Sequence, residues 1–246
     1  MKIGILSDIH SNLEALKEIY ATLVYEGCEH IYCLGDVIGY GPNPKECINF
    51  IRTKNIKTIL GNHDQYVIDI NSDWPIKSYA KDAILWTRSQ LGQQDFEWLR
   101  CLPMKIEEHN LTFIHASLDD TLIPSWPYIL DTVTAGRHFF FQKTPICFFG
   151  HVHIPLLYSI GASKRVELDL LRTTSLTQNS GTKYLINVGS VGQPRDSDDR
   201  ASAVVFDTDS FFVKLLRITY DVKTTYDKIL SSDLPAILAD RLLTGK

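Results

Sequence analysis

The sequence has no long apolar run, no Cys-x-x-Cys pair and no block of basic residues. At its N-terminus only residues 3–6 form an apolar run before Ser7 and Asp8. That run is far too short for a signal-peptide core or a membrane span. We therefore expect a protein that is neither exported by that route nor embedded in a membrane.

The cysteines, five in all, are an odd number without close pairing. This usage argues against both a disulfide framework and a thiolate zinc site. Cys33 and Cys147 lie inside apolar runs, where cysteine behaves as a small buried hydrophobe. A reducing compartment fits this pattern, so we expect a cytoplasmic protein.

The formal net charge is −4, and lysine and arginine are not clustered. Such a surface offers no broad footprint for a nucleic-acid duplex, so nucleic acid is not the expected partner. An anionic substrate must be attracted by the site itself. The length of 246 residues, with 44% hydrophobic and 22% charged residues, is typical of one globular domain spanning residues 1–246.

Five short apolar runs each stop at polar residues that can bind a metal. Bounded runs rich in isoleucine and aromatic residues predict buried strands. Because ligands bind beyond the carboxyl ends of strands in layered α/β proteins, the polar residues are expected to converge. The runs are residues 3–6 before Asp8 and His10, 31–34 before Asp36, 58–60 before Asn62 and His63, 111–114 before His115, and 146–149 before His151 and His153.

Helical signals separate the first three of these strands. Ser11, with Glu14 three residues later, forms a capping-box signature, and Gly27 provides a stop. Asn43 and Pro44 predict the N-cap and first residue of the next helix. The resulting alternation of strands and helices predicts the α/β class.

The rest of the chain has a different pattern. Residues from about 65 to 102 predict a helical insert beside the sheet. Strand signals at 156–160, 165–170, 184–188, 203–206 and 211–218 suggest a second, more antiparallel sheet. Residues 222–244 predict C-terminal helices, with Asp233 as a candidate N-cap and Gly245 as a stop. The apolar residues available for burial in the insert are Trp74, Ile84, Leu85, Trp86, Leu91, Phe96, Trp98 and Leu99.

The candidate ligands are aspartate, histidine and asparagine, a set that suits manganese, iron, zinc or nickel. One carboxylate shared by two ions holds them roughly 3.5–4 Å apart, near enough to clamp the attacking and leaving oxygens of a phosphoryl centre. Asp36, flanked by Gly35 and Gly39, is the expected bridge. Taken alone, the first block is more often a helix N-cap with a surface histidine, the third is typical of a turn, and the last is also compatible with a strand end, so the prediction depends on their combination.

The ordered blocks at residues 7–10, 35–41, 61–64, 115 and 150–153 resemble those of the calcineurin-like metallophosphoesterases. This resemblance spans residues 3 to about 155 and implies a four-layer α/β/β/α sandwich of two mixed sheets, with a dinuclear metal site at the strand ends. It implies in-line attack of a metal-activated water on phosphate esters or nucleotide anhydrides. His63 is implied to stabilise the transition state or protonate the leaving oxygen, with Asp64 orienting it. The implied ligands are Asp8, His10, Asp36 and His153 for one ion, and Asp36, Asn62, His115 and His151 for the other.

Residues 39–44 and 187–195 resemble a narrower branch, related to diadenosine tetraphosphatases, which suggests a small phosphorylated or nucleotide substrate. In this interpretation Arg195 binds a phosphate, Tyr40 contacts the leaving group, and Asn62 also contacts substrate. The alternative for Arg195 is a surface salt bridge with one of the aspartates at positions 196, 198 and 199.

Two other functions stay open. A non-catalytic protein-binding scaffold of the same fold is disfavoured by His63, because such relatives lose the equivalent histidine. A nuclease is disfavoured by the acidic balance and the absence of a basic track. His30, His109 and His138 are expected to be structural or exposed, and the aromatic run 139–141 is expected in the core, with adenine stacking as its alternative.

Overall fold

A computed structural model describes residues 1–70, 76–119, 126–178 and 181–246. Within these ranges the strands form two mixed sheets of six strands each, in the orders β3-β2-β1-β11-β12-β9 and β4-β5-β6-β10-β7-β8. The first sheet contains β1 (Lys2–Leu6), β2 (His30–Cys33), β3 (Lys57–Thr58), β9 (Thr174–Ser175), β11 (Ala201–Asp207) and β12 (Phe212–Ile218). The second contains β4 (Lys105–Glu108), β5 (Leu111–Ile114), β6 (Ile146–Phe149), β7 (Leu156–Ile160), β8 (Val166–Leu170) and β10 (Lys183–Asn187).

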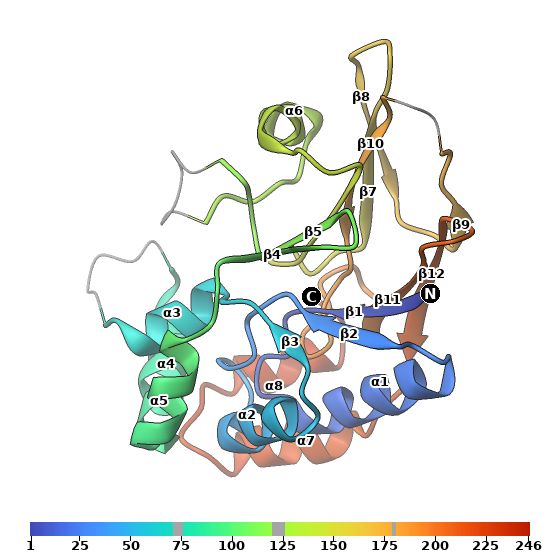
Figure 1. The fold of residues 1–246 in the computed structure, drawn as a ribbon. Helices are drawn as coiled ribbons and strands as arrows, with labels where there is room; N and C mark the ends of the chain where they lie inside the picture. Colours follow the sequence, from blue (N-terminus) through green and yellow to red (C-terminus); the bar gives the residue numbers. More distant parts are fainter. Residues whose placement is uncertain (71–75, 120–125, 179–180) are drawn as a thin grey trace.

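Helices cover the outer faces of both sheets. In Figure 1, α6 lies on the second sheet, and α1, α2 and α7 lie on the far side of the first. The arrangement confirms the predicted four-layer α/β/β/α sandwich. The helices are α1 (Leu13–Tyr25), α2 (Pro44–Thr53), α3 (Asn62–Ile68), α4 (Ser78–Gln90), α5 (Gln93–Arg100), α6 (Thr132–Phe141), α7 (Val222–Leu230) and α8 (Ile237–Leu242).

The two sheets pack face to face through a core of large apolar side chains. Ile3 and Ile5 of β1 point into this core, whereas Gly4 between them lies under Leu23 of α1. This alternation follows from the two-residue period of a strand. Tyr32 from the first sheet stacks on Phe113 from the second, with ring centroids 4.1 Å apart. Burial of such a core contributes about 25 cal/mol per Å² of apolar surface.

The late strands divide between the two sheets: β7, β8 and β10 form an antiparallel part of the second sheet, as predicted, whereas the prediction was wrong for β11 and β12. Strand β11 pairs antiparallel with β1 and β12 pairs with β11, so both extend the first sheet. Strand β10 pairs parallel with β6 and antiparallel with β7 in the second sheet. Alternation along a strand identifies its buried face but not its neighbour, which long-range pairing selects.

Two predicted helix caps were also wrong. Asn12, rather than Ser11, caps α1, because its Oδ1 accepts the N–H of Ala15 at 3.1 Å. Asp221 caps α7, whereas Asp233 lies in the turn between α7 and α8. The predicted start of α2 at Asn43 and Pro44 is confirmed. Gly27 and Gly245, at the predicted helix stops, both adopt positive φ.

The insert consists of α3, α4 and α5, and it begins earlier than expected. Asn62, His63 and Asp64 form the first turn of α3, where the sequence was also compatible with an isolated turn. Ile84 and Leu99 are buried as predicted. Leu85 is 52% exposed, and Trp74 lies outside the described residues. Helix α3 therefore carries the third polar block on its N-terminus.

The aromatic run at 139–141 belongs to α6 and is only partly in the core. Phe139 is buried, whereas Phe140 is 84% exposed and Phe141 is 39% exposed. Consecutive residues of a helix point in different directions, so only one of the three faces the second sheet. His138 is buried beside them, in agreement with a structural role.

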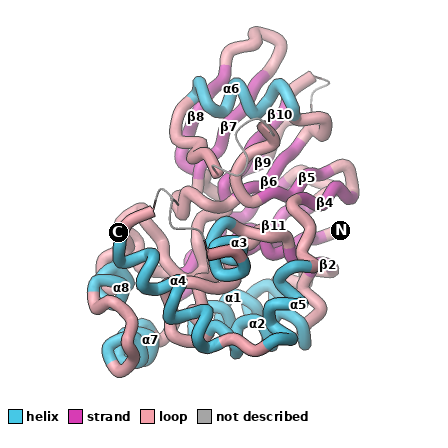
Figure 2. Tube along the Cα trace, turned by 90° about the vertical axis from the view of Figure 1, so that its left-hand side faces the viewer, coloured by secondary structure: helices cyan, strands magenta, loops and turns pink. Residues whose placement is uncertain are grey.

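The C-terminal helices pack against α4 and around Tyr40, beside the polar loops. Figure 2 shows α4, α7 and α8 on the same side of the molecule. Buried residues of all three helices form one apolar cluster with Tyr40, and Arg241 of α8 donates to the Tyr79 hydroxyl of α4 at 2.9 Å. Tyr40 thereby links this helical cluster to the loops that follow β2.

Candidate metal centre

The predicted polar residues follow neighbouring strands at one edge of the two sheets, on loops except for the third block, which begins α3. Backbone hydrogen bonds tie these loops together: Asp8 N donates to Gly35 O at 3.1 Å, His10 N to Asp36 O at 2.9 Å, and Gly150 N to His115 O at 3.0 Å. The side chains are therefore held in place by the main chain itself.

Several of these residues have backbone conformations that side chains rarely adopt. The φ angles are 54° at Asp8, 46° at His10, 52° at Asp36, 66° at His151 and 64° at His153. Each such residue costs of order 1–2 kcal/mol, and such strain clusters at functional sites. The pattern repeats at positions i and i+2 in both the first and the last block.

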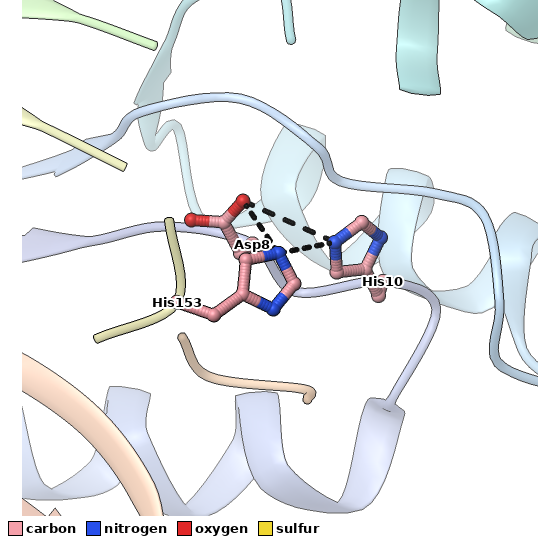
Figure 3. A group of neighbouring side chains, drawn as sticks. All are labelled: Asp8, His10 and His153. Carbon is pink, nitrogen blue, oxygen red and sulfur yellow. Dashed lines mark hydrogen bonds and ion pairs between the residues drawn. The ribbon is translucent and has the colours of Figure 1, made fainter. Parts of the chain in front are cut away.

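The donor atoms of the first cluster come from Asp8, His10 and His153, which Figure 3 shows converging. His153 Nε2 lies 3.2 Å from Asp8 Oδ1 and 3.1 Å from His10 Nε2. All three residues are at most 2% exposed. Three candidate ligand atoms thus surround one point in the interior.

A second cluster contains Asp36, His115 and His151. His115 Nε2 lies 3.4 Å from Asp36 Oδ2 and 2.9 Å from Asn62 Oδ1. The same Asp36 oxygen is 3.6 Å from His10 Nε2 of the first cluster. Asp36 therefore lies between the two clusters.

Four backbone carbonyls fix which nitrogen each histidine turns toward the centre. A carbonyl only accepts, so the ring nitrogen that faces it carries the proton and the other nitrogen offers a lone pair. These contacts are His10 Nδ1 to Ile38 O (3.3 Å), His115 Nδ1 to Leu34 O (2.7 Å), His153 Nδ1 to Gln193 O (2.6 Å) and His151 Nε2 to Trp126 O (2.9 Å). Two carboxylates, four oriented imidazoles and one amide oxygen fit divalent cations of borderline or hard character.

Comparison with known proteins decides the family of this site. Residues 1–210 match the profile of the calcineurin-like phosphoesterase superfamily domain. The chain belongs to this superfamily. It is therefore a metallophosphoesterase, a hydrolase of phosphate esters, and the resemblance inferred from the sequence blocks is confirmed. Helices α7 and α8 lie beyond the matched residues.

Two known proteins resemble this chain over its whole length, and a third resembles about half of it. An uncharacterized protein of Methanocaldococcus jannaschii is 37% identical over 99% of this chain and 98% of its own length. The crystal structure of a metallophosphoesterase from Sphaerobacter thermophilus has a TM-score of 0.83 and 34% identity, with 100% of both chains covered. The symmetrical bis(5'-nucleosyl)-tetraphosphatase of Chromobacterium violaceum is 25% identical over 51% of this chain and 45% of that protein.

The pKa values of the buried carboxyls Asp8 and Asp36 depend on two opposing effects, burial and the neighbouring histidines. Burial opposes ionisation of both carboxyls, but His153 beside Asp8 and His115 beside Asp36 hold their pKa values below the usual range. Burial also opposes a charge on His115, yet Asp36 raises the pKa of His115 to about 9. Burial lowers the pKa of His151 to about 3. Asp36 and His115 thus each favour the charged form of the other against the effect of burial.

His63 differs from the other histidines of the phosphoesterase site. Its ring packs against His10 and Tyr40, with centroids 4.8 Å and 4.3 Å away, and its Nδ1 is buried without a hydrogen-bond partner among the described residues. Burial lowers the pKa of His63 to about 4, although Asp36 opposes the shift. This unpartnered nitrogen lies beside Gly39, where even a Cβ would be only 2.8 Å away. His63 also forms a third group of candidate donors with His10 and Asp36, so its ring lies within reach of both clusters.

Asp64, the residue expected to orient His63, makes no hydrogen bond to the His63 ring among the described residues. Its two oxygens accept backbone N–H groups instead, from Ile38 at 3.2 Å and Gly61 at 3.1 Å. The backbone N–H of His63 donates to Asp36 Oδ1 at 2.8 Å. Asp64 thus secures the start of α3 and the loop before it, and reaches His63 through the main chain.

Arg195 and Tyr40 lie together beside the clusters. The Arg195 guanidinium is 5.9 Å from the centre of the Tyr40 ring and donates to Gln193 Oε1 at 3.0 Å. Of the aspartates considered as salt-bridge partners, Asp196 pairs with Arg217 and Asp198 with Arg200. The arginine is therefore held near the site by uncharged groups.

Several residues with clear roles gave no signal in the sequence. Asn12 makes four hydrogen bonds, donating to Gly192 O and Tyr220 Oη and accepting from Ala15 N and Thr225 Oγ1. Trp126 and Tyr128 lie against His151, 23 or more residues earlier in the chain. Such contacts depend on tertiary structure, and no local spacing marks them. Within the described residues, no helix combines the length and hydropathy that crossing a bilayer requires.

Proposed function

We propose that this phosphoesterase uses two divalent ions, of manganese, iron, zinc or nickel, to hydrolyse small phosphate monoesters, diesters or dinucleoside polyphosphates. The observation that supports it best is the convergence of buried donor groups around Asp36, with the four histidines of the two ligand sets oriented by backbone carbonyls. Relatives named as tetraphosphatases, over about half of the chain, support a nucleotide substrate.

In this proposal the two ligand sets share Asp36. Two ions held there would neutralise phosphate charge and lower the pKa of a water that attacks phosphorus in line. Their ligands are Asp8, His10, Asp36 and His153 for one ion, and Asp36, Asn62, His115 and His151 for the other.

The remaining side chains act on the substrate. His63 donates its ring N–H to the leaving oxygen, and Asp64 is a positioning residue that fixes the first turn of α3. Arg195 binds a non-bridging phosphate oxygen, Asn62 contacts the phosphate as well as an ion, and Tyr40 packs beside the leaving group. A donor to the leaving oxygen, the role proposed for His63, typically increases the rate ~10²–10⁴-fold.

The cellular location, the domain organisation and the size of the substrate are proposed from other features of the chain. Five free cysteines, three of them buried, support work in the cytoplasm. The packing of α4, α7 and α8 into one cluster with Tyr40 supports a single domain over residues 1–246. The net charge of −4 supports a small substrate rather than nucleic acid.

Metal-stripped protein reloaded with Mn²⁺ tests the proposal against aryl phosphate monoesters and diesters and dinucleoside polyphosphates. We expect turnover that falls at least about 100-fold in His63→Asn while bound metal is unchanged. His109→Asn, on the β4–β5 turn, is the matched control and keeps full activity. Metal binding without turnover of any ester by the wild type would contradict the proposal and favour a binding scaffold.

A further inference from the structure

Tyr128 presents an aromatic ring beside the proposed metal site. Its ring lies nearly parallel to that of His151, at 18° with centroids 4.2 Å apart. His151 covers one face of the ring, yet Tyr128 is 51% exposed. Its other face is thus open to solvent next to a buried, charged site.

The neighbouring segment holds this ring in place. Trp126 is 4% exposed, and its carbonyl accepts the Nε2–H of His151 at 2.9 Å. Its indole N–H donates to Gln65 Oε1 of α3 at 3.0 Å, and its ring contacts that of His115 edge-on, at 5.5 Å. Tyr128, two residues later, is therefore anchored to both α3 and the second cluster. An ordered aromatic group of this kind loses little entropy when a ligand stacks on it.

The groups around Tyr128 suit a planar, anionic ligand. The Tyr40 ring lies 4.6 Å from the His10 ring of the first cluster, and the Arg195 guanidinium lies 5.9 Å from the Tyr40 ring. Tyr40 and Arg195 therefore lie beside the first cluster, and Tyr128 lies beside the second. Arg195 provides a cation beside the first cluster. A phosphate bound at the metal clusters would lie beside Tyr128, because Tyr128 stacks on His151 of the second ligand set.

We propose that Tyr128 is a specificity-determining residue whose exposed face stacks on a planar aromatic group of the substrate, either a nucleobase or an aryl leaving group. This inference rests on the proposed phosphoesterase function and adds a second recognition element beside the phosphate. Packing against His151 uses one face of the ring and leaves about half of the side chain exposed beside the site.

Binding to Mn²⁺-loaded protein tests the inference by calorimetry, with two matched pairs of ligands. Adenosine 5'-monophosphate is compared with ribose 5-phosphate, and phenyl phosphate with methyl phosphate. In Tyr128→Leu, we expect the Kd of an aromatic member to rise about tenfold, with that of its partner unchanged. Tyr128→Phe keeps wild-type affinities, and Tyr25→Leu, an 89% exposed tyrosine of α1, is the control.

The two pairs distinguish the sources of the aromatic group. A change confined to the first pair identifies a nucleobase, and one in both pairs identifies any aryl group. Equal changes for both members of each pair, or loss of bound manganese in Tyr128→Leu, would mean that Tyr128 only packs on His151. Because binding is measured without turnover, a failure of the hydrolytic proposal would be seen separately.

Discussion

The Nε2 atoms of His10 and His153 lie 3.1 Å apart, although the two residues are separated by 143 positions. Each ring uses its Nδ1 proton for a backbone carbonyl, so both Nε2 atoms present lone pairs to each other when the rings are neutral. Burial lowers the pKa of both rings, which favours that neutral form. Two lone pairs that face each other repel. A cation bound between them, beside Asp8 and Asp36, would accept both lone pairs and remove this repulsion.

Divalent metal should therefore stabilise the fold. At 100 times the Kd, Mn²⁺ adds about 2.7 kcal/mol to the free energy of unfolding, which raises the Tm by about 5–10 °C. Calorimetry of metal-stripped protein should show this rise in the wild type and in His30→Ala, whose side chain lies in β2 away from the clusters. A full rise in His153→Ala would contradict the role of His153.

Two glycine substitutions should have opposite effects on stability. A Cβ at Gly192 would lie 1.8 Å from the Ile9 carbonyl oxygen, between Asp8 and His10, so Gly192→Ala should lower the free energy of unfolding by about 3 kcal/mol or more. Gly136, inside α6, has only an ordinary contact 3.7 Å away with Val166. Gly136→Ala should raise stability by about 0.5–1 kcal/mol. Urea denaturation of both variants measures the contrast, and equal effects would refute it.

The bond between Thr225 and Asn12 should couple α7 to the first loop. Thr225 is fully buried, and its hydroxyl lies 3.1 Å from Asn12 Oδ1 and 2.9 Å from Glu14 Oε2 of α1, so its one proton is shared between these two acceptors. Thr225→Val keeps the shape but loses the hydrogen bond, so the free energy of unfolding should fall by about 1–2 kcal/mol. Thr225→Ser keeps the hydroxyl, so its free energy of unfolding should fall less than that of Thr225→Val. Chemical denaturation that ranks the serine variant below the valine variant would oppose this coupling.

His138 should make stability depend on pH. Burial lowers the pKa of His138 to about 4, against about 6.5 in an unfolded chain. Between these values the unfolded state binds the extra proton, so stability falls as pH drops from 6.5 to 4, by up to about 1.4 kcal/mol per pH unit. The slope should be shallower in His138→Asn. Parallel pH profiles of the two proteins, from denaturation at each pH, would exclude this contribution.

The sequence predicted most of what forms the two clusters. The apolar runs before Asp8, Asp36, His115 and His151 do form β1, β2, β5 and β6, because short buried strands have a strong local signal. The ends of parallel strands meet at one edge, which brings the polar blocks together.

What the sequence missed depends on distant contacts. The choice between Ser11 and Asn12 as cap is settled by bonds to Gly192, Tyr220 and Thr225, which lie far along the chain. The exposure of Phe140 depends on which face of α6 meets the second sheet. The positive φ angles of the ligand loops come from the packing of several loops together, and the residue types at these positions do not predict them.

The central claim is that two ions share Asp36, and counting bound manganese by elemental analysis after equilibrium dialysis tests it most directly. Two ions per chain are expected for the wild type and for Asp207→Asn, whose carboxylate lies at the end of β11. Asp36→Asn should hold fewer than one ion, because the bridging charge is lost from both sets. One ion or none in the wild type, or two retained in Asp36→Asn, would contradict the account.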